Sequence, residues 1–280
     1  MADTLKEYLR DPFLNRLYSD IRKAGPIRAI SVDITDVCNL RCRGCYFFAE
    51  DMDKNKTPED EAEFDAFIER EKARGTNFIT VLGGEPSLTL PRLKKLHNNF
   101  LTTVVTNGIR RIPFAGFEKI SIAISVWGDH KTDKRLRGDG KVDVFAKGLE
   151  NYKNDPRVGW YYTTTTGNAS EIESVVGQCV ANGNYVVPNF YGDISQIGAD
   201  LDHRRGFNQV RHELNRMIER YPDRIFCTSY IIYVITTGML YEEKWGYDVC
   251  GSVTFDNERT GNGLKMASPS IHTFVLIILT

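Results

Sequence analysis

Three cysteines in one short polar loop are the residues of this chain best suited to chemistry. Cys38, Cys42 and Cys45 follow the spacing CxxxCxxC, with an asparagine and two arginines between them. Three thiolates within eight residues can bind one thiophilic metal centre. In a four-iron cluster they leave one iron open for another molecule. Zinc is the alternative, although a structural zinc site needs four ligands and no His or fourth Cys lies nearby.

A glycine-rich motif, Gly83-Gly84-Glu85-Pro86, follows about one strand–helix unit later, at the end of an apolar run. Glycines let a backbone approach a ligand closely, and Glu85 offers an acceptor opposite an ammonium group. The alternative is a turn followed by a helix that begins at Pro86. The position of the motif, one unit after the cysteine loop, favours the ligand interpretation.

Further candidates stand at the ends of later apolar runs. Thr106 and Asn107 end the third run, where a turn and a ligand contact are equally good interpretations, and Ser125 ends the fourth. Arg137 lies in a loop ahead of a predicted helix, and its fork suits a carboxylate through two parallel hydrogen bonds. A solvated arginine in a charged loop is the alternative, with Arg135 as the rival choice.

Together these motifs resemble the radical SAM enzyme superfamily over roughly residues 27–195. One departure is Gly44 before the third cysteine, where many members carry an aromatic residue; here the aromatics follow at 46–48. The resemblance implies a [4Fe–4S] cluster on the three cysteines, with S-adenosylmethionine (SAM) chelating the fourth iron. It implies SAM contacts, with Glu85 facing the amino group, from a set comprising Gly83, Gly84, Glu85, Pro86, Thr106, Asn107, Ser125 and Arg137.

The resemblance also implies a reaction. An electron from a donor such as flavodoxin or ferredoxin cleaves SAM to a 5′-deoxyadenosyl radical, which abstracts hydrogen from, or adds to, an organic substrate. The sequence does not identify that substrate, which could be a peptide, a lipid or a small molecule. The alternative is a non-catalytic iron–sulfur or metal-binding protein on the same barrel.

The elements that must position these residues alternate along the chain. Short apolar runs predict six parallel strands, and 3.6-residue periodicity predicts helices between them. The strands are expected at 28–34, 77–82, 101–106, 119–126, 158–165 and 184–190, and the helices at 58–74, 88–98, 141–153 and 169–182. Such alternation is typical of α/β proteins, and the resemblance implies a partial (β/α)6 barrel.

Three regions are expected along the chain. A single N-terminal helix occupies residues 1–26, the barrel 27–205, and an extension with a helix at 207–220 occupies 206–280. The apolar run 274–279 is either a strand at the barrel edge or the abnormal end of a chain whose relatives continue further, and we favour the second. Cys179 and Cys227 are expected in the core, Cys250 is undecided, and no second cluster is predicted.

Composition narrows the protein class. The chain of 280 residues is 41% hydrophobic and 26% charged, with a formal charge of −1, so no electrostatic case exists for nucleic acid or anionic membrane. The apolar runs are shorter than the roughly 20 residues of a membrane span. Six cysteines do not resemble a secreted disulfide framework and the N-terminal segment lacks a signal-peptide core. The reducing cytoplasm is therefore expected.

Overall fold

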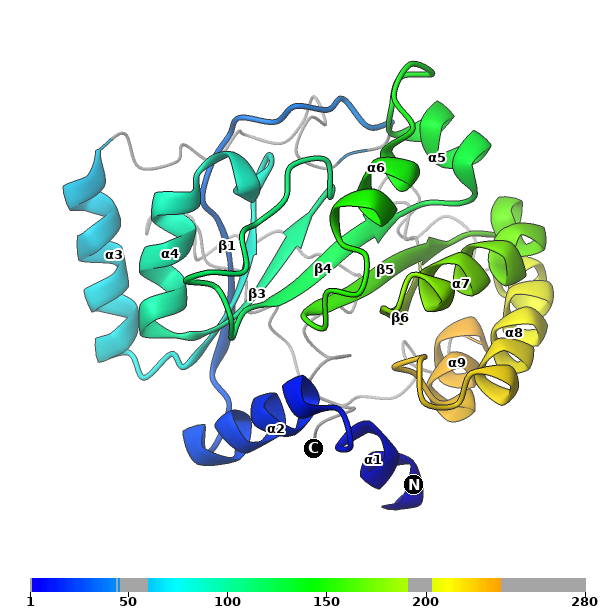
Figure 1. Ribbon diagram of the computed structural model, residues 1–280, viewed down its shortest axis with the longest axis horizontal. Helices are drawn as coiled ribbons and strands as arrows, with labels where there is room; N and C mark the ends of the chain where they lie inside the picture. Colours follow the sequence, from blue (N-terminus) through cyan, green and yellow to red (C-terminus); the bar gives the residue numbers. More distant parts are fainter. Residues whose placement is uncertain (1, 44, 46–59, 191–202, 238–280) are drawn as a thin grey trace.

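Six parallel strands in chain order form the centre of the protein (Figure 1). The computed structural model describes residues 2–43, 45, 60–190 and 203–237. The strands are β1 Ala29–Asp33, β2 Phe78–Leu82, β3 Leu101–Thr106, β4 Ser121–Val126, β5 Val158–Thr164 and β6 Tyr185–Phe190. Each strand pairs in parallel with the next, from β1 to β6. This order confirms the predicted α/β fold with six parallel strands.

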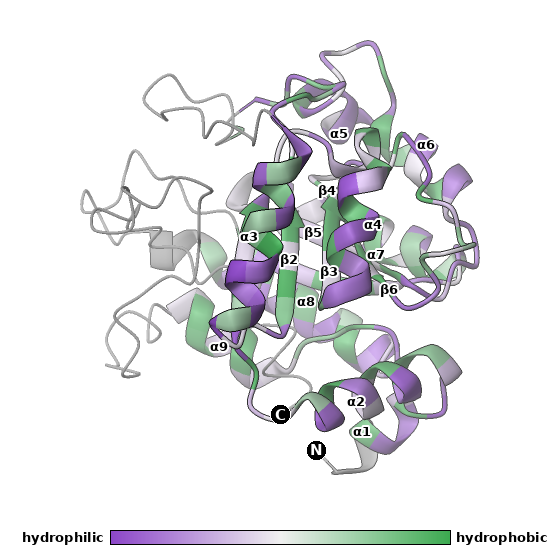
Figure 2. Ribbon diagram, turned by 90° about the vertical axis from the view of Figure 1, so that its left-hand side faces the viewer, coloured by the Kyte–Doolittle hydropathy of each residue, from purple (hydrophilic) through white to green (hydrophobic). Residues whose placement is uncertain are grey.

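The helices between the strands cover one face of the sheet. They are α3 Glu61–Ala73, α4 Leu90–Asn99, α5 His130–Leu136, α6 Val144–Asn151 and α7 Ile172–Ala181, and α8 His203–Arg220 follows the last strand. Side chains alternate between the two faces of a strand, so Ile122 and Ile124 of β4 enter the core shared with these helices. Between them, Ala123 belongs instead to a smaller group on the other face, with Tyr161 and Val187. Figure 2 shows the apolar residues gathered on the strands.

The predicted single N-terminal helix is wrong. The segment forms α1 Ala2–Tyr8 and α2 Pro12–Ala24, which lie below the sheet in Figure 1. The Asp11 carboxylate accepts hydrogen bonds from the backbone N–H groups of Phe13 and Leu14, and so caps α2. Pro12 suits the first helical position because its missing N–H would have no intrahelical partner there.

A second difference lies after β4, where α5 occupies residues predicted as a loop. Asp129 begins this helix by accepting a hydrogen bond from Thr132 N at 2.9 Å. Elsewhere the predicted helices shift by a few residues, and short 3₁₀ turns precede α4 and α7: η2 Pro86–Leu88 and η3 Thr166–Glu171. The site residues predicted to lie in loops after the strands are therefore held in part by helices and 3₁₀ turns.

The C-terminal part of the described chain contains α8 and α9 Ser229–Thr237. Val210 and Leu214 of α8 belong to the same apolar core as the strands. Cys179 and Cys227 are buried, as predicted. Cys250, the aromatic residues at 46–48, Gly44 and the apolar run 274–279 lie outside the described residues. Across the described residues, none of the helices combines the length and apolar character needed to span a bilayer.

Candidate functional site

The glycine-rich motif pairs with the segment that leads into the cysteine loop. Gly84 N donates to Thr35 O at 2.7 Å and Glu85 N donates to Val37 O at 2.8 Å, which extends the β1–β2 pairing beyond the strands. A Cβ atom on Gly84 would lie 2.3 Å from Val37 O, and one on Gly83, whose φ is +125°, would lie 2.6 Å from Thr35 O. The glycines are thus required by neighbouring backbone, whereas the sequence interpretation gave them a ligand.

The Glu85 carboxylate is buried and joins the ends of two strands. Its Oε1 accepts hydrogen bonds from Ser87 N at 2.9 Å and Thr106 Oγ1 at 2.6 Å, and its Oε2 accepts one from Asn107 N at 2.8 Å. A carboxylate offers about four acceptor positions, so roughly one remains for a ligand. Pro86 begins η2 directly after it, so the turn and Pro-initiated helix weighed in the sequence are present as well.

Asn107 connects the end of β3 to the cysteine loop. Its Nδ2 donates to Asn39 Oδ1 at 2.7 Å, while its Oδ1 accepts from Ile109 N at 2.9 Å. The side chain therefore both forms the turn after β3 and contacts the loop. The turn weighed in the sequence is therefore present, and the ligand contact of Thr106 and Asn107 stays a prediction.

The three cysteine side chains of the loop form no disulfide within the described residues and are of intermediate burial. Leu40 N donates to Cys38 Sγ at 3.4 Å, and Cys45 N donates to Cys42 O at 3.3 Å. Burial raises the pKa of Cys38 and of Cys42, and the charges of the neighbouring cysteines add to the rise. For Cys42 the positive charge of Arg137 acts in the opposite direction.

The donor set fits an iron–sulfur cluster better than a single ion. Within the described ranges, no three His, Cys, Asp or Glu side chains form a group that could hold one metal ion. A cluster bonds each thiolate to a different iron, so its cysteines need not meet at one point. Three soft thiols, an N–H donor to one sulfur and a guanidinium beside another suit an anionic cluster.

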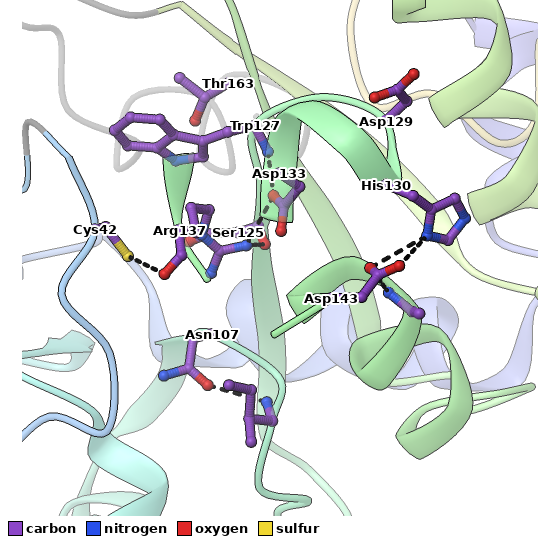
Figure 3. A network of polar contacts seen from close by, with 12 residues as sticks. Cys42, Asn107, Ser125, Trp127, Asp129, His130, Asp133, Arg137, Asp143 and Thr163 are labelled. Carbon is purple, nitrogen blue, oxygen red and sulfur yellow. Dashed lines mark hydrogen bonds and ion pairs between the residues drawn. The ribbon is translucent and has the colours of Figure 1, made fainter. Parts of the chain in front are cut away.

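Arg137 lies at the end of α5, beside the cysteine loop (Figure 3). Its side chain is 3% exposed, so the solvated interpretation is wrong, whereas the rival Arg135 is exposed. Nη1 of Arg137 donates to the backbone oxygen of Ser125 and to Asp133 Oδ2. The structure thus brings together two predicted residues, Ser125 and Arg137, and adds Asp133.

Two further contacts fasten the cysteine loop to this helix end. Arg43 N donates to Leu136 O at 2.8 Å, and Cys42 Sγ donates to Arg137 O at 3.9 Å. Sequence reasoning missed Asp133 and Asn39. Asp133 had one readable signal, its position four residues before Arg137 on what proves to be a helix, where opposite charges face each other. Nothing in the loop sequence singled out Asn39.

Comparison with known proteins places these residues in one family. The model of the radical SAM superfamily matches residues 32–164, a range that holds every predicted site residue. A probable GTP 3′,8-cyclase of Methanococcus aeolicus is 29% identical over 140 residues, covering 44% of this chain and 45% of that protein. An Fe-coproporphyrin III synthase of Methanosarcina barkeri is 26% identical over 157 residues, covering 51% and 38%. The matches thus span less than half the length of these relatives.

Solved structures share the fold at low identity. Native anSMEcpe with bound AdoMet aligns over 82% of this chain and 72% of its own, with a TM-score of 0.59 and 16% identity. Streptococcus suis SuiB bound to its precursor peptide SuiA aligns over 79% and 54%, with a TM-score of 0.52 and 18% identity. The likeness confirms the partial barrel. Residues 32–164, which carry the cysteine loop and the glycine-rich motif, match the radical SAM superfamily, which implies a [4Fe–4S] cluster and SAM as cofactors.

Proposed function

We propose that this chain carries the catalytic core of an enzyme that cleaves SAM reductively and uses the resulting 5′-deoxyadenosyl radical on an organic substrate. The observation that supports the proposal most is the attachment of the cysteine loop at the carboxyl ends of the strands. The Glu85–Asn107–Asn39 chain holds it on one side, and the end of α5 holds it on the other. Parallel sheets bind their ligands at this edge.

The residues of the site have distinct proposed tasks. Cys38, Cys42 and Cys45 hold three irons and leave the fourth open. Glu85 offers its remaining acceptor position to the SAM ammonium, and Arg137, with Ser125 beside it, faces the carboxylate and ribose. A zwitterionic amino acid thereby meets an anion after β2 and a cation after α5. Gly83, Gly84, Pro86 and Thr106 shape and support this edge.

For the substrate and the electron donor, only a chemical class can be proposed. The names of the two curated relatives describe different reactions, one on GTP and one that forms Fe-coproporphyrin III. A peptide, a lipid or a small molecule therefore all stay open as substrate. We propose flavodoxin or ferredoxin as the class of donor, because cleavage of SAM consumes one electron that no described side chain supplies.

Anaerobic reconstitution tests the proposal. Purified protein is loaded with iron and sulfide, and SAM and dithionite are then added. We expect about four irons per chain, and methionine with 5′-deoxyadenosine as products. Cys42→Ala should lose the cluster, whereas Cys179→Ala, which truncates a buried thiol of α7, should keep it. A normal cluster in Cys42→Ala would refute the proposal. An intact wild-type cluster that binds SAM without cleaving it would favour the non-catalytic alternative.

A further inference from the structure

Asp133 and Arg137 form a buried ion pair whose hydrogen bonding is incomplete. Their side chains are 0% and 3% exposed, and Arg137 Nη1 lies 3.2 Å from Asp133 Oδ2. The same Oδ2 accepts a hydrogen bond from Trp127 N at 2.9 Å, while Oδ1 is buried without a partner in the described part of the chain. Removing two charges from water costs more than such a pair returns unless its hydrogen bonds are completed. Stability alone therefore does not account for the pair.

The pair adjoins a proposed ligand of the cluster. Cys42 Sγ donates to the backbone oxygen of Arg137 at 3.9 Å, and the Arg137 side chain is close enough to that sulfur for their charges to interact. The backbone bond from Arg43 N to Leu136 O holds the loop in place against the same helix end. In Figure 3, Arg137 lies between Cys42 and Asp133.

We propose that Asp133 is a positioning residue that holds the Arg137 guanidinium against the Cys42 sulfur, and that these two charges together set the reduction potential of the cluster. This inference rests on the proposed function, because it requires a [4Fe–4S] cluster on the loop. Reduction adds an electron to the cluster, so a nearby cation raises its potential and a nearby anion lowers it. Both effects are strong where water is excluded.

The arrangement predicts opposite effects from its two members. The guanidinium lies next to the sulfur and raises the potential, whereas the carboxylate lies behind it and limits that rise. Trp127 N and the Ser125 oxygen hold the pair to the end of β4, so neither side chain is free to turn away.

Potentiometric titration of the reconstituted cluster, followed by EPR in the absence of SAM, measures these effects. Asp133→Asn keeps the shape and an acceptor for Trp127 N but removes the negative charge, so the potential should shift to more positive values. Arg137→Gln keeps donors but removes the positive charge, so the potential should shift to more negative values. Asp143→Asn is the matched control: its carboxylate is partly exposed and faces His130, so the potential should not move beyond replicate error.

Opposite shifts with full iron content support the proposal. Shifts of the same sign, or unchanged potentials in both variants, overturn it. Loss of the cluster in both variants also overturns it, since the pair would then be a structural requirement of the loop. If only Arg137→Gln loses the cluster, the sign of the shift in Asp133→Asn decides. A wild-type protein without a four-iron cluster would refute the proposed function itself, which separates the two failures.

Discussion

Two buried aspartate–arginine pairs lie at opposite ends of the sheet and differ in how fully they are bonded. Asp155 and Arg157 precede β5 at its amino end, with side chains 1% and 0% exposed. Arg157 Nε and Nη2 bind the two carboxylate oxygens at 2.9 and 2.6 Å. The remaining N–H groups bind backbone oxygens of Ile112, Pro113 and Phe117. All five guanidinium donors are thus used.

The pair at the carboxyl end leaves bonding capacity free. Among the described residues, Arg137 binds oxygen atoms through Nη1, and Asp133 Oδ1 has no hydrogen-bond partner there. Buried polar groups are nearly always satisfied, so an exception marks a place where something else is bound or where the environment is used. The completed pair fastens the fold, whereas we propose that the incomplete pair beside the cysteine loop serves the site.

The largest expected effect is a difference in the free energy of unfolding between variants of the two pairs. Arg157→Met leaves Asp155 charged and buried, and should lower the free energy of unfolding by about 3–5 kcal/mol. Arg137→Met should cost less, because it removes two hydrogen bonds to oxygen atoms of the described residues, whereas Arg157→Met removes five. Urea denaturation of both variants measures the difference. Equal losses would remove the distinction between the two ends.

A smaller effect is expected where the glycine-rich motif meets the cysteine loop. Gly84→Ala places a methyl group against the backbone oxygen of Val37, which should cost about 1–3 kcal/mol and reduce iron content after reconstitution. Gly177→Ala in α7 is the matched control, since its nearest neighbour would be 3.9 Å away. That change should stabilise the protein by about 0.5–1 kcal/mol. Full iron content in Gly84→Ala would show that the close approach does not shape the loop.

Protonation of His97, whose ring stacks on Phe117 near the amino end of the sheet, should lower the stability of the protein at acid pH. Burial, helped by the charge of Lys94, lowers the pKa of His97 to about 4. Between pH 6.5 and 4 the unfolded state therefore binds more protons than the folded state, and stability falls as the pH falls. Since the ring is half-buried, we expect a loss of about 1 kcal/mol between pH 7 and 5. Urea denaturation at several pH values should show this loss, and His97→Phe should abolish it.

His130, near the carboxyl end, should show the opposite dependence and the smallest effect. Burial opposes its charge, but hydrogen bonds to Gln178 and Asp143 outweigh burial, so the pKa of His130 is raised. Its contribution to stability is fully present below pH 6.5 and is lost as the pH rises through the raised pKa. His130→Gln should therefore lower stability at pH 5.5 more than at pH 8.5, by well under 1 kcal/mol because the ring is partly exposed. A larger loss at pH 8.5 would contradict this sign.

The sequence by itself determined the family and the order of the strands. The cysteine spacing and the glycine-rich motif are local patterns, and so are the short apolar runs that became β1 to β6. The split of the N-terminal segment was also readable, from Asp11 before Pro12, as was the start of α5 from Asp129. Both depend on capping by near neighbours in the chain.

Only the tertiary structure decided what these residues touch. Cys42 and Arg137 are in contact although they are 95 positions apart in the sequence. Glu85 and Asn107 are hydrogen-bonded although they are 22 positions apart. Gly84 is required because residues 35–37 pass close to it, whereas Gly83 is required both by that close approach and by its own φ of +125°. Local patterns record conformational preference and burial, whereas these contacts arise because parallel strands bring distant loops to one edge of the sheet.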